Sequence, residues 1–195
     1  MAQKQKRDIE MTRTALLDAA KSLMTSCADS DEVTSRAIAT KAGVNLAMIN
    51  YCYGSREELL YEVFRQLLGD VQKANPDLTD MLSSNLPAKE RIAIIHFNMM
   101  KLMIVNFNYS KAITKYIILN RTDGIGMESL PFIIEHFNGR KTLEECKLIS
   151  FELSSLHELA VLRHKELKEL CGTDLINEDV LKEYVRRNVE RFLAG

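Results

Sequence analysis

Glycine and proline are both scarce in this chain, with 8 and 3 residues among 195. Because these two residues interrupt helices and dominate tight turns, their scarcity argues against a sheet-rich protein. Leu, Ile, Ala, Glu and Lys are common instead. The composition therefore predicts an all-helical (all-α) protein. The chain is long enough for one substantial core, or for a small domain joined to a larger one.

An excess of charge of one sign is also missing, since the formal net charge is -1. No global field draws such a chain to nucleic acid or to a membrane surface, so any binding of a polyanion must come from a local patch. No apolar run approaches the roughly 20 residues that a membrane-spanning helix needs. We therefore expect no membrane partner.

Paired cysteines are absent as well. Residues Cys27, Cys52, Cys146 and Cys171 are scattered and form no CxxC pair. Residues 1–13 are polar and lack the apolar core of a secretory signal. These features predict reduced thiols in a cytoplasmic protein, with no cofactor and no metal.

Helical periodicity organises the rest of the chain. Residues 1–7 are expected to be a mobile polar tail, followed by a helix over 9–27. Thr34 is a good N-cap for a short second helix that Gly43 ends, and a third helix is expected over 45–53. Capping boxes at Ser55 and Thr142 open two longer helices. The remaining expected helices cover 87–108, 110–119, 131–137, 142–171 and 177–193, with connections at 75–90 and 120–129.

Residues 34–53 have the spacing of a helix-turn-helix, with the helix over 9–27 to brace it. The second helix of such a unit enters the major groove with its N-terminal end first, so its outward side chains must be short, polar or small. Asn pairs well with adenine, small apolar groups meet the thymine methyl, and a Tyr hydroxyl donates to phosphate. The residues that fit this need are Asn45, Ala47, Asn50 and Tyr51.

The preceding helix supplies a second set of candidates. Thr34, Ser35 and Arg36 stand at its N-terminus, where free amides and the helix dipole favour a phosphate. Val44 and Ile49 are spaced to point inward and hold the turn. The alternative interpretation is a solvated helix pair in which Asn50 and Tyr51 are merely exposed.

The run VTSRAIATKAGVNLAMINYCYGSREELL, residues 33–60, closely resembles the DNA-binding domain of the tetracycline-repressor (TetR) family. The matching residues are Thr34, Ile38-Ala39, Ala42-Gly43-Val44, Asn45-Leu46-Ala47, Ile49-Asn50-Tyr51, Tyr53-Gly54-Ser55 and Leu59. The resemblance adds Leu46 and Arg56 to the DNA-facing set. Cys52 stands where His or Tyr is frequent, which weakens the case for a phosphate contact there. Tyr53 replaces the usual Phe and is expected to pack beneath the recognition helix.

The resemblance implies a dimeric transcriptional regulator, usually a repressor. Such a protein binds a palindromic double-stranded DNA operator and is released by a small-molecule effector. The domains would be a helix-turn-helix at 1–55, a connecting helix at 56–75, and a ligand-binding and dimerisation domain at 76–195. Helices 142–171 and 177–193 would pair with those of a second copy. The seam residues would be Leu153, Leu156, Ala160, Val161, Leu181, Val185 and Val189, unless they belong to the monomer's own core.

A mainly apolar effector pocket is the least specific expectation, because a methionine stripe at helical spacing is more often plain core. Its candidate lining is Met99, Met103, Phe107, Tyr116, His136, Phe137 and Phe151.

Enzyme motifs are incomplete, so the protein is not expected to be an enzyme. His157-Glu158 begins a zinc-protease pattern, but Val161 stands where the second histidine is needed. His157 and His164 share a helical face, and a metal pair there is the weaker interpretation. The alternative function of a different class is a helical ligand-sensing or protein-interaction module with no operator binding.

Overall fold

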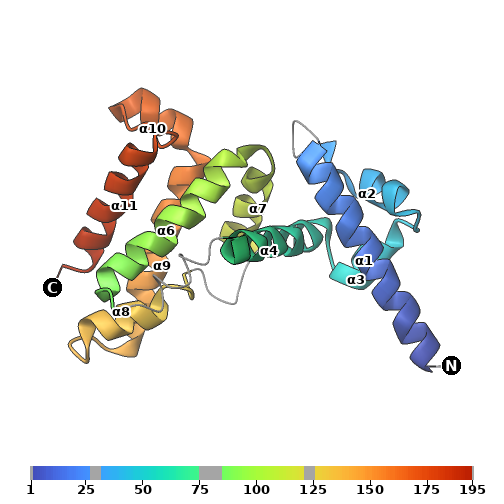
Figure 1. The fold of residues 1–195 in the computed structure, drawn as a ribbon, viewed down its shortest axis with the longest axis horizontal. Helices are drawn as coiled ribbons and strands as arrows, with labels where there is room; N and C mark the ends of the chain where they lie inside the picture. Colours follow the sequence, from blue (N-terminus) through green and yellow to red (C-terminus); the bar gives the residue numbers. More distant parts are fainter. Residues whose placement is uncertain (1, 27–31, 75–84, 121–125, 195) are drawn as a thin grey trace. The chain divides into compact units, whose positions relative to one another are not determined.

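The computed structural model describes residues 2–26, 32–74, 85–120 and 126–194, and all the regular structure within them is helical (Figure 1). The prediction of an all-helical fold is therefore confirmed. Cys27 and most of the predicted connection at 75–90 lie outside the described residues. The helices are α1 (Ala2–Ser26), α2 (Ser35–Ala42), α3 (Ala47–Tyr53), α4 (Arg56–Ala74), α6 (Ala88–Val105), α7 (Phe107–Asn120), α8 (Leu130–Phe137), α9 (Leu143–Leu162), α10 (His164–Cys171) and α11 (Glu178–Phe192).

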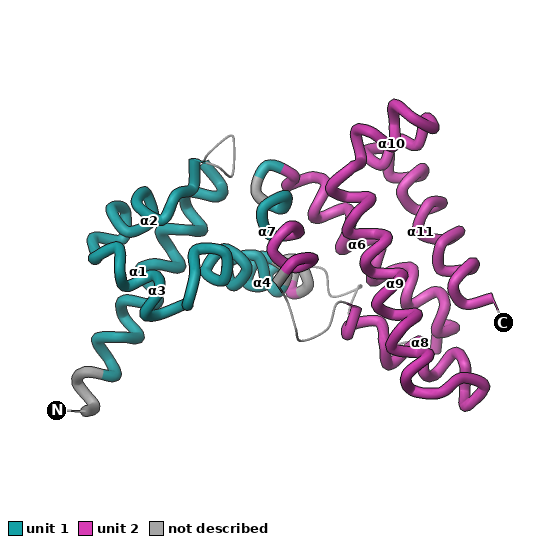
Figure 2. Tube along the Cα trace, turned by 180° about the vertical axis from the view of Figure 1, so that it is seen from behind, with its two compact units in different colours: residues 1–71, 108–113 teal, residues 72–107, 114–195 magenta. Residues whose placement is uncertain are grey.

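The chain divides into two compact units (Figure 2). The first unit holds residues 1–71 and 108–113, and the second holds 72–107 and 114–195. The first unit therefore takes in α1 to α3 together with most of α4, which the sequence had predicted as a separate connecting helix at 56–75.

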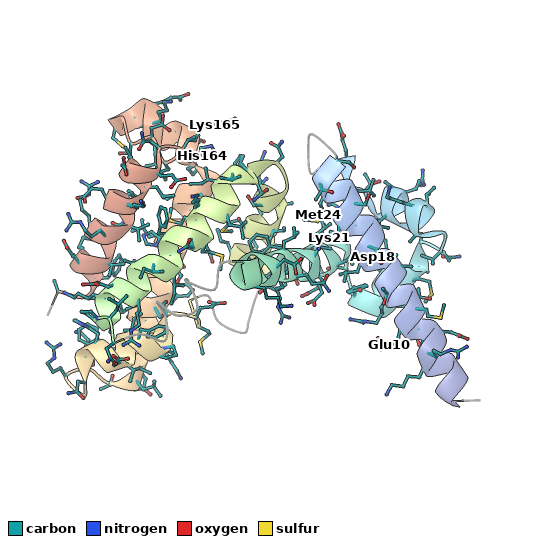
Figure 3. All side chains as sticks on the ribbon, in the orientation of Figure 1. Glu10, Asp18, Lys21, Met24, His164 and Lys165 are labelled. Carbon is teal, nitrogen blue, oxygen red and sulfur yellow. The ribbon has the colours of Figure 1, made fainter. Side chains whose placement is uncertain are left out.

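In the first unit, α1 packs against both α2 and α3. Leu16 and Met24 of α1 (Met24 is labelled in Figure 3), Ile38 of α2 and Ile49 of α3 are buried in its core. The predicted mobile tail at 1–7 is wrong for Ala2–Arg7, because α1 already begins at Ala2. Gln, Lys and Arg are good helix formers, so the polar start of the chain can continue the helix.

In the second unit, α6 packs along α9 and α11, and α8 packs on α6 and α9. Figures 1 and 2 show α8 and α10 at opposite ends of this unit. Its largest fully buried side chains include Ile92, Met100, Ile133, Phe137 and Leu153.

The long helix predicted over 142–171 is two helices, because the backbone turns at Arg163 (φ -112°, ψ 24°). Nδ1 of His164 donates to the Val161 carbonyl at 2.9 Å, which satisfies one of the carbonyls of the last turn of α9. The predicted capping box at Thr142 is present in both directions. The start of this helix was therefore readable from sequence, whereas its break at Arg163 was not.

Gly126 shows where the second unit tolerates no side chain. Its φ is +85°, and a Cβ there would lie 2.4 Å from the Ser150 carbonyl oxygen and 2.6 Å from Ser154 Oγ. Gly139 has a similar φ of +82°, but a Cβ there would meet nothing within 4 Å. The two glycines therefore share a backbone conformation and differ only in how closely a neighbouring helix approaches.

We expect Gly126→Ala to lower the free energy of unfolding by about 2–5 kcal/mol, because the left-handed backbone and the clash with α9 both oppose it. The matched control Gly139→Ala meets only the backbone penalty and should cost about 1–2 kcal/mol. Urea unfolding of both variants measures the difference. Equal losses would show that segment 126–129 can move away from α9.

Candidate nucleic-acid interface

The turn between α2 and α3 is built from one cap and one left-handed glycine. Thr34 Oγ1 accepts the Ala37 N–H at 3.1 Å and starts α2. Gly43 then ends α2 with φ 67° and ψ 28°. The Val44 N–H donates to the Ala39 carbonyl at 3.0 Å, and the Gly43 N–H to the Thr40 carbonyl at 3.2 Å. This Schellman-type pairing reverses the chain within a few residues and aims it into the next helix.

Asn45 has a structural role in addition to its predicted one. Its Oδ1 accepts the N–H of Ala47, the first residue of α3, at 2.8 Å. Asn45 itself lies outside α3, which begins at Ala47, two residues after the start expected from the sequence. The amide NH₂ of Asn45 can still donate to a partner.

The seven residues of α3 present two different faces. Ile49 and Cys52 are buried against the first unit. Ala47, Asn50 and Tyr51 are exposed on the other face, with Leu46 beside them. Tyr51 keeps 66 % of its surface in contact with solvent. The structure thus gathers these four predicted residues on one open surface.

The N-terminus of α2 adds the second predicted set to this unit. Thr34 and Arg36 are exposed and Ser35 is half-buried, so all three remain accessible at the first turn of the helix. Lys41, in the last turn of α2, is exposed as well. These residues supply two cationic side chains within α2.

Arg56, which the resemblance placed in the DNA-facing set, makes contacts within the first unit. Its Nε donates to the Val33 carbonyl at 2.6 Å, and its Nη1 pairs with Glu57 at 3.0 Å. The side chain ties the start of α4 to the residue that precedes the Thr34 cap. This arginine therefore helps to hold the helix-turn-helix together from within.

Cys52 and Tyr53 are inward residues. Cys52 is buried, which agrees with the absence of a strong polar role there. The Tyr53 hydroxyl donates to the Arg13 carbonyl of α1 at 2.8 Å. Burial raises the pKa of this hydroxyl, although the Arg13 charge opposes the shift. Tyr53 therefore packs against α1 from beneath α3, as the sequence predicted.

The seven predicted seam residues do not form an open surface. Six of them are buried within a single copy of the second unit and only Leu156 is partly exposed. These residues are core, which is the alternative that the sequence left open. The apolar side chains that α9 exposes are others: Leu143 at its start, at 48 %, and Leu148, Phe151 and Leu159 further along, at 56 %, 50 % and 51 % exposure.

The predicted effector residues do not converge on one place. Phe107 lies edge-on to His164 at the start of α10, with ring centroids 4.5 Å apart (His164 is labelled in Figure 3). His136 and Phe137 belong to α8, at the opposite end of the unit, where the His136 ring bonds the Leu193 carbonyl at 3.0 Å. Met103 is buried, and Phe151 is half exposed on α9. The set is therefore split between the two ends and the surface of the unit.

A buried polar chain crosses the second unit, and sequence reasoning missed it. His96 Nδ1 of α6 lies 2.9 Å from His157 Nδ1 of α9. At its other nitrogen, His96 bonds Ser129 Oγ at 3.3 Å, while His157 Nε2 bonds Nδ2 of Asn188 in α11 at 3.3 Å. Ser129 Oγ in turn lies 3.1 Å from the Gly126 carbonyl. The sequence did contain a signal for this polar chain, because His96 and His157 both occupy core-facing positions of apolar helices.

The donors and acceptors along this chain agree with two neutral histidines. Because Asn188 donates to His157 Nε2, the His157 proton sits on Nδ1 and is donated to His96 Nδ1. The His96 proton then sits on Nε2 and is donated to Ser129, whose hydroxyl donates to Gly126. A proton added to His96 Nδ1 would face the donor Nδ1 of His157, and one added to His157 Nε2 would face the donor Nδ2 of Asn188.

Burial has the same consequence for the charge of the two rings. It lowers the pKa of His96 to about 4. Burial, and then the neighbouring His96, lower the pKa of His157 to about 2. Both rings are therefore uncharged at neutral pH. His157 faces His96 and His164 bonds Val161, so these two histidines do not form the metal pair that the sequence left as the weaker interpretation. Among the described residues, no group of three or more His, Cys, Asp or Glu side chains is placed to hold a metal.

Three features of the described residues bear on the class of protein. The first unit carries a helix-turn-helix with an open α3, and the second is a separate helical body. None of the helices in the described part of the chain has the length and apolar character required to cross a membrane. Cys52, Cys146 and Cys171 are free thiols, as predicted.

Comparison with family models finds no match, and comparison with curated proteins finds none either. Among solved structures, the chain is similar to a TetR-like transcriptional regulator from Rhodococcus sp. RHA1. The two share 18 % sequence identity with a TM-score of 0.52, over 94 % of this chain and 96 % of the other. The chain therefore has the fold of a TetR-like transcriptional regulator, over nearly its whole length.

We expect the folded protein to keep His96 and His157 neutral as the pH falls from 7 to 5, and its stability to decrease over that range. Below about pH 6.5 both histidines become protonated in the unfolded chain, whereas the buried rings of the folded protein stay neutral. The free energy of unfolding then falls by up to about 1.4 kcal/mol per pH unit for each ring. Urea unfolding at several pH values measures this slope. Imidazole ¹⁵N shifts should show the proton on Nδ1 of His157 and on Nε2 of His96; a charged ring in the folded protein at pH 6 would contradict the arrangement.

Proposed function

We propose that this protein is a dimeric, DNA-binding transcriptional repressor with α3 as its recognition helix. The observation that carries the proposal is the open face of α3, where Ala47, Asn50 and Tyr51 are exposed on a helix aimed by a tight turn. A helix that presents small and amide side chains without bulky obstruction can approach base edges in the major groove. The fold likeness to a TetR-like regulator supports this function.

The individual contacts follow from the chemistry of each side chain. Asn50 is proposed to read a base edge, and Leu46 and Ala47 to meet thymine methyl groups. The Tyr51 hydroxyl, the Asn45 amide, and Thr34, Ser35 and Arg36 at the start of α2 are proposed to bind the phosphate backbone. Arg56 is left out of this set because its guanidinium is engaged with Val33 and Glu57.

Dimerisation is proposed to use the exposed apolar face of α9. Leu148, Phe151 and Leu159 recur at helical spacing along this face. The outer face of α11 is different, since Arg186 there pairs with both Glu183 and Glu190. An apolar stripe on one helix can cover its own two-fold mate, because an isologous interface joins the same patch on both copies. Two recognition helices could then read a palindrome.

The effector is proposed to be a small, mainly apolar molecule that binds the second unit. It must prefer the state in which the two recognition helices do not match successive major grooves, because equal affinity for both states would shift nothing. We propose no catalytic role and no cofactor for the chain. The split placement of Phe107 and Phe137 argues against a pocket that contains the whole predicted lining.

Selection of binding sites from random duplex DNA by the full-length protein tests the function. We expect an enriched palindrome. Asn50→Ala should then relax base preference at one position per half-site by about 1–3 kcal/mol. Tyr51→Phe should weaken binding to all sequences by roughly 1 kcal/mol, the order of one net hydrogen bond. A folded dimer that enriches no sequence at low salt would favour a ligand-sensing or interaction module without an operator.

Phe151→Glu should convert the dimer to a monomer, because it places a charge at the centre of the apolar face of α9. Light scattering after size-exclusion chromatography measures the mass, and operator affinity should fall with it. Leu170→Glu is the matched control, since Leu170 is 83 % exposed on α10, outside the proposed interface. A Phe151→Glu protein that remains dimeric would place the interface elsewhere.

A further inference from the structure

The recognition helix has too few residues to hold its own orientation. A helix of seven residues is marginal in water, so its position depends on its neighbours. Ile49 and Cys52 bury one face of α3 and decide which side points inward. Two buried side chains decide which face points inward but do not by themselves fix the tilt and rotation of the helix. Base recognition is sensitive to displacements well below 1 Å, so a further contact is needed.

Arg13 of α1 and Tyr53 of α3 hold each other by three contacts. Arg13 Nη1 donates to the carbonyl of Cys52. The guanidinium carbon lies 4.4 Å from the centre of the Tyr53 ring. In return, the Tyr53 hydroxyl donates to the backbone carbonyl of Arg13 at 2.8 Å. Arg13 thus binds the backbone carbonyl of the residue before Tyr53, and Tyr53 binds the backbone carbonyl of Arg13 itself. The guanidinium also stacks on the Tyr53 ring. We refer to this arrangement as the Arg13–Tyr53 clamp.

The clamp acts on the end of α3 that lacks its own hydrogen-bond partners. Cys52 contributes one of the last carbonyls of the helix, while the Asn50 carbonyl is satisfied by the Gly54 N–H at 2.9 Å. A cation at a helix C-terminus also interacts favourably with the helix dipole. Arginine suits both tasks, because its planar head can donate a hydrogen bond and stack on an aromatic ring at once.

The clamp lies on the side of α3 away from the proposed DNA surface. At about 100° per residue, Tyr53 is roughly 200° around the helix from Tyr51. Tyr51 is exposed, whereas Tyr53 is half-buried against α1. The clamp can therefore orient the exposed face without contacting DNA.

We propose that Arg13 and Tyr53 are positioning residues that set the tilt and rotation of the recognition helix and thereby determine discrimination between the operator and other DNA. This inference rests on the proposed DNA-binding function. Loss of the clamp misaligns Asn50 and its neighbours with base edges but removes no phosphate contact. Specific binding should then weaken, while non-specific binding and its dependence on salt stay unchanged.

The test compares full-length Arg13→Lys, Arg13→Met and Tyr53→Phe with the wild type. Each protein is titrated with the selected operator and with a random duplex over a series of salt concentrations. We expect the ratio of operator affinity to random-duplex affinity to fall about tenfold or more in both Arg13 variants, and severalfold in Tyr53→Phe. The salt slope on the random duplex should match that of the wild type. Arg36→Gln is the contrasting variant, which should weaken both DNAs alike and lower the slope by about one.

Each other outcome overturns the inference. If Arg13 bound phosphate directly, Arg13→Met would lower the salt slope by about one and Arg13→Lys would restore binding. If the clamp only supported folding, a smaller active fraction would reduce both affinities equally and leave their ratio unchanged. The Arg13→Lys/Tyr53→Phe double variant adds a further check, since losses that simply add would mean that the two residues do not act together. A wild type without sequence preference would overturn the proposed function, and with it the clamp.

Discussion

A helix of seven residues with one buried and one exposed face sets the main constraint on the first unit. Such a helix gains little from its own hydrogen bonds, so each of its ends needs support from elsewhere. Asn45 Oδ1 accepts the first N–H of α3 and Gly54 follows its end, while Ile49 fixes the inward face. The orientation of the exposed face of α3 therefore depends on how well these neighbours hold the helix.

Two arginines illustrate how the first unit meets this constraint. Arg13 binds the last turn of α3 from α1, and Arg56 binds the Val33 carbonyl just before the cap of α2. Both side chains carry a charge that could have bound DNA phosphate directly. Each instead donates to a backbone carbonyl beside a short helix and so joins two segments of the first unit. A positive charge near a helix-turn-helix is thus not by itself a DNA contact.

The second unit obeys a different constraint, because polar groups cross its apolar core. His96, His157 and Asn188 come from three helices, and each finds its partner inside the unit. A buried chain of hydrogen bonds is stable only when every member is satisfied, and it then favours one packing of the helices over others. Gly126 completes this arrangement by letting its segment approach α9 closely.

Local patterns were sufficient for most of the helices and for the recognition surface. Thr34, Gly43 and Thr142 act through residues within a few positions along the chain, so their roles could be recognised from sequence. The shared exposed face of Ala47, Asn50 and Tyr51 could be predicted for the same reason, since the period of a helix decides which side chains share a face. The break at Arg163 was missed because no Gly or Pro marks it. The helical start at Ala2 was missed although the Gln, Lys and Arg residues that follow favour a helix.

Which apolar residues form the core, and which remain exposed, was decided only by the tertiary structure. Leu153 and Phe151 lie two positions apart on α9, and a sequence pattern ranks both as apolar; packing against α6 and α11 buries the first and leaves the second half exposed. The pairing of His96 with His157, 61 positions apart, likewise depends on how three helices meet. The sequence by itself determined the helices, their caps and the turn, because those interactions are local. The assignments of core, clamp and polar chain required the fold, because they join residues that only packing brings together.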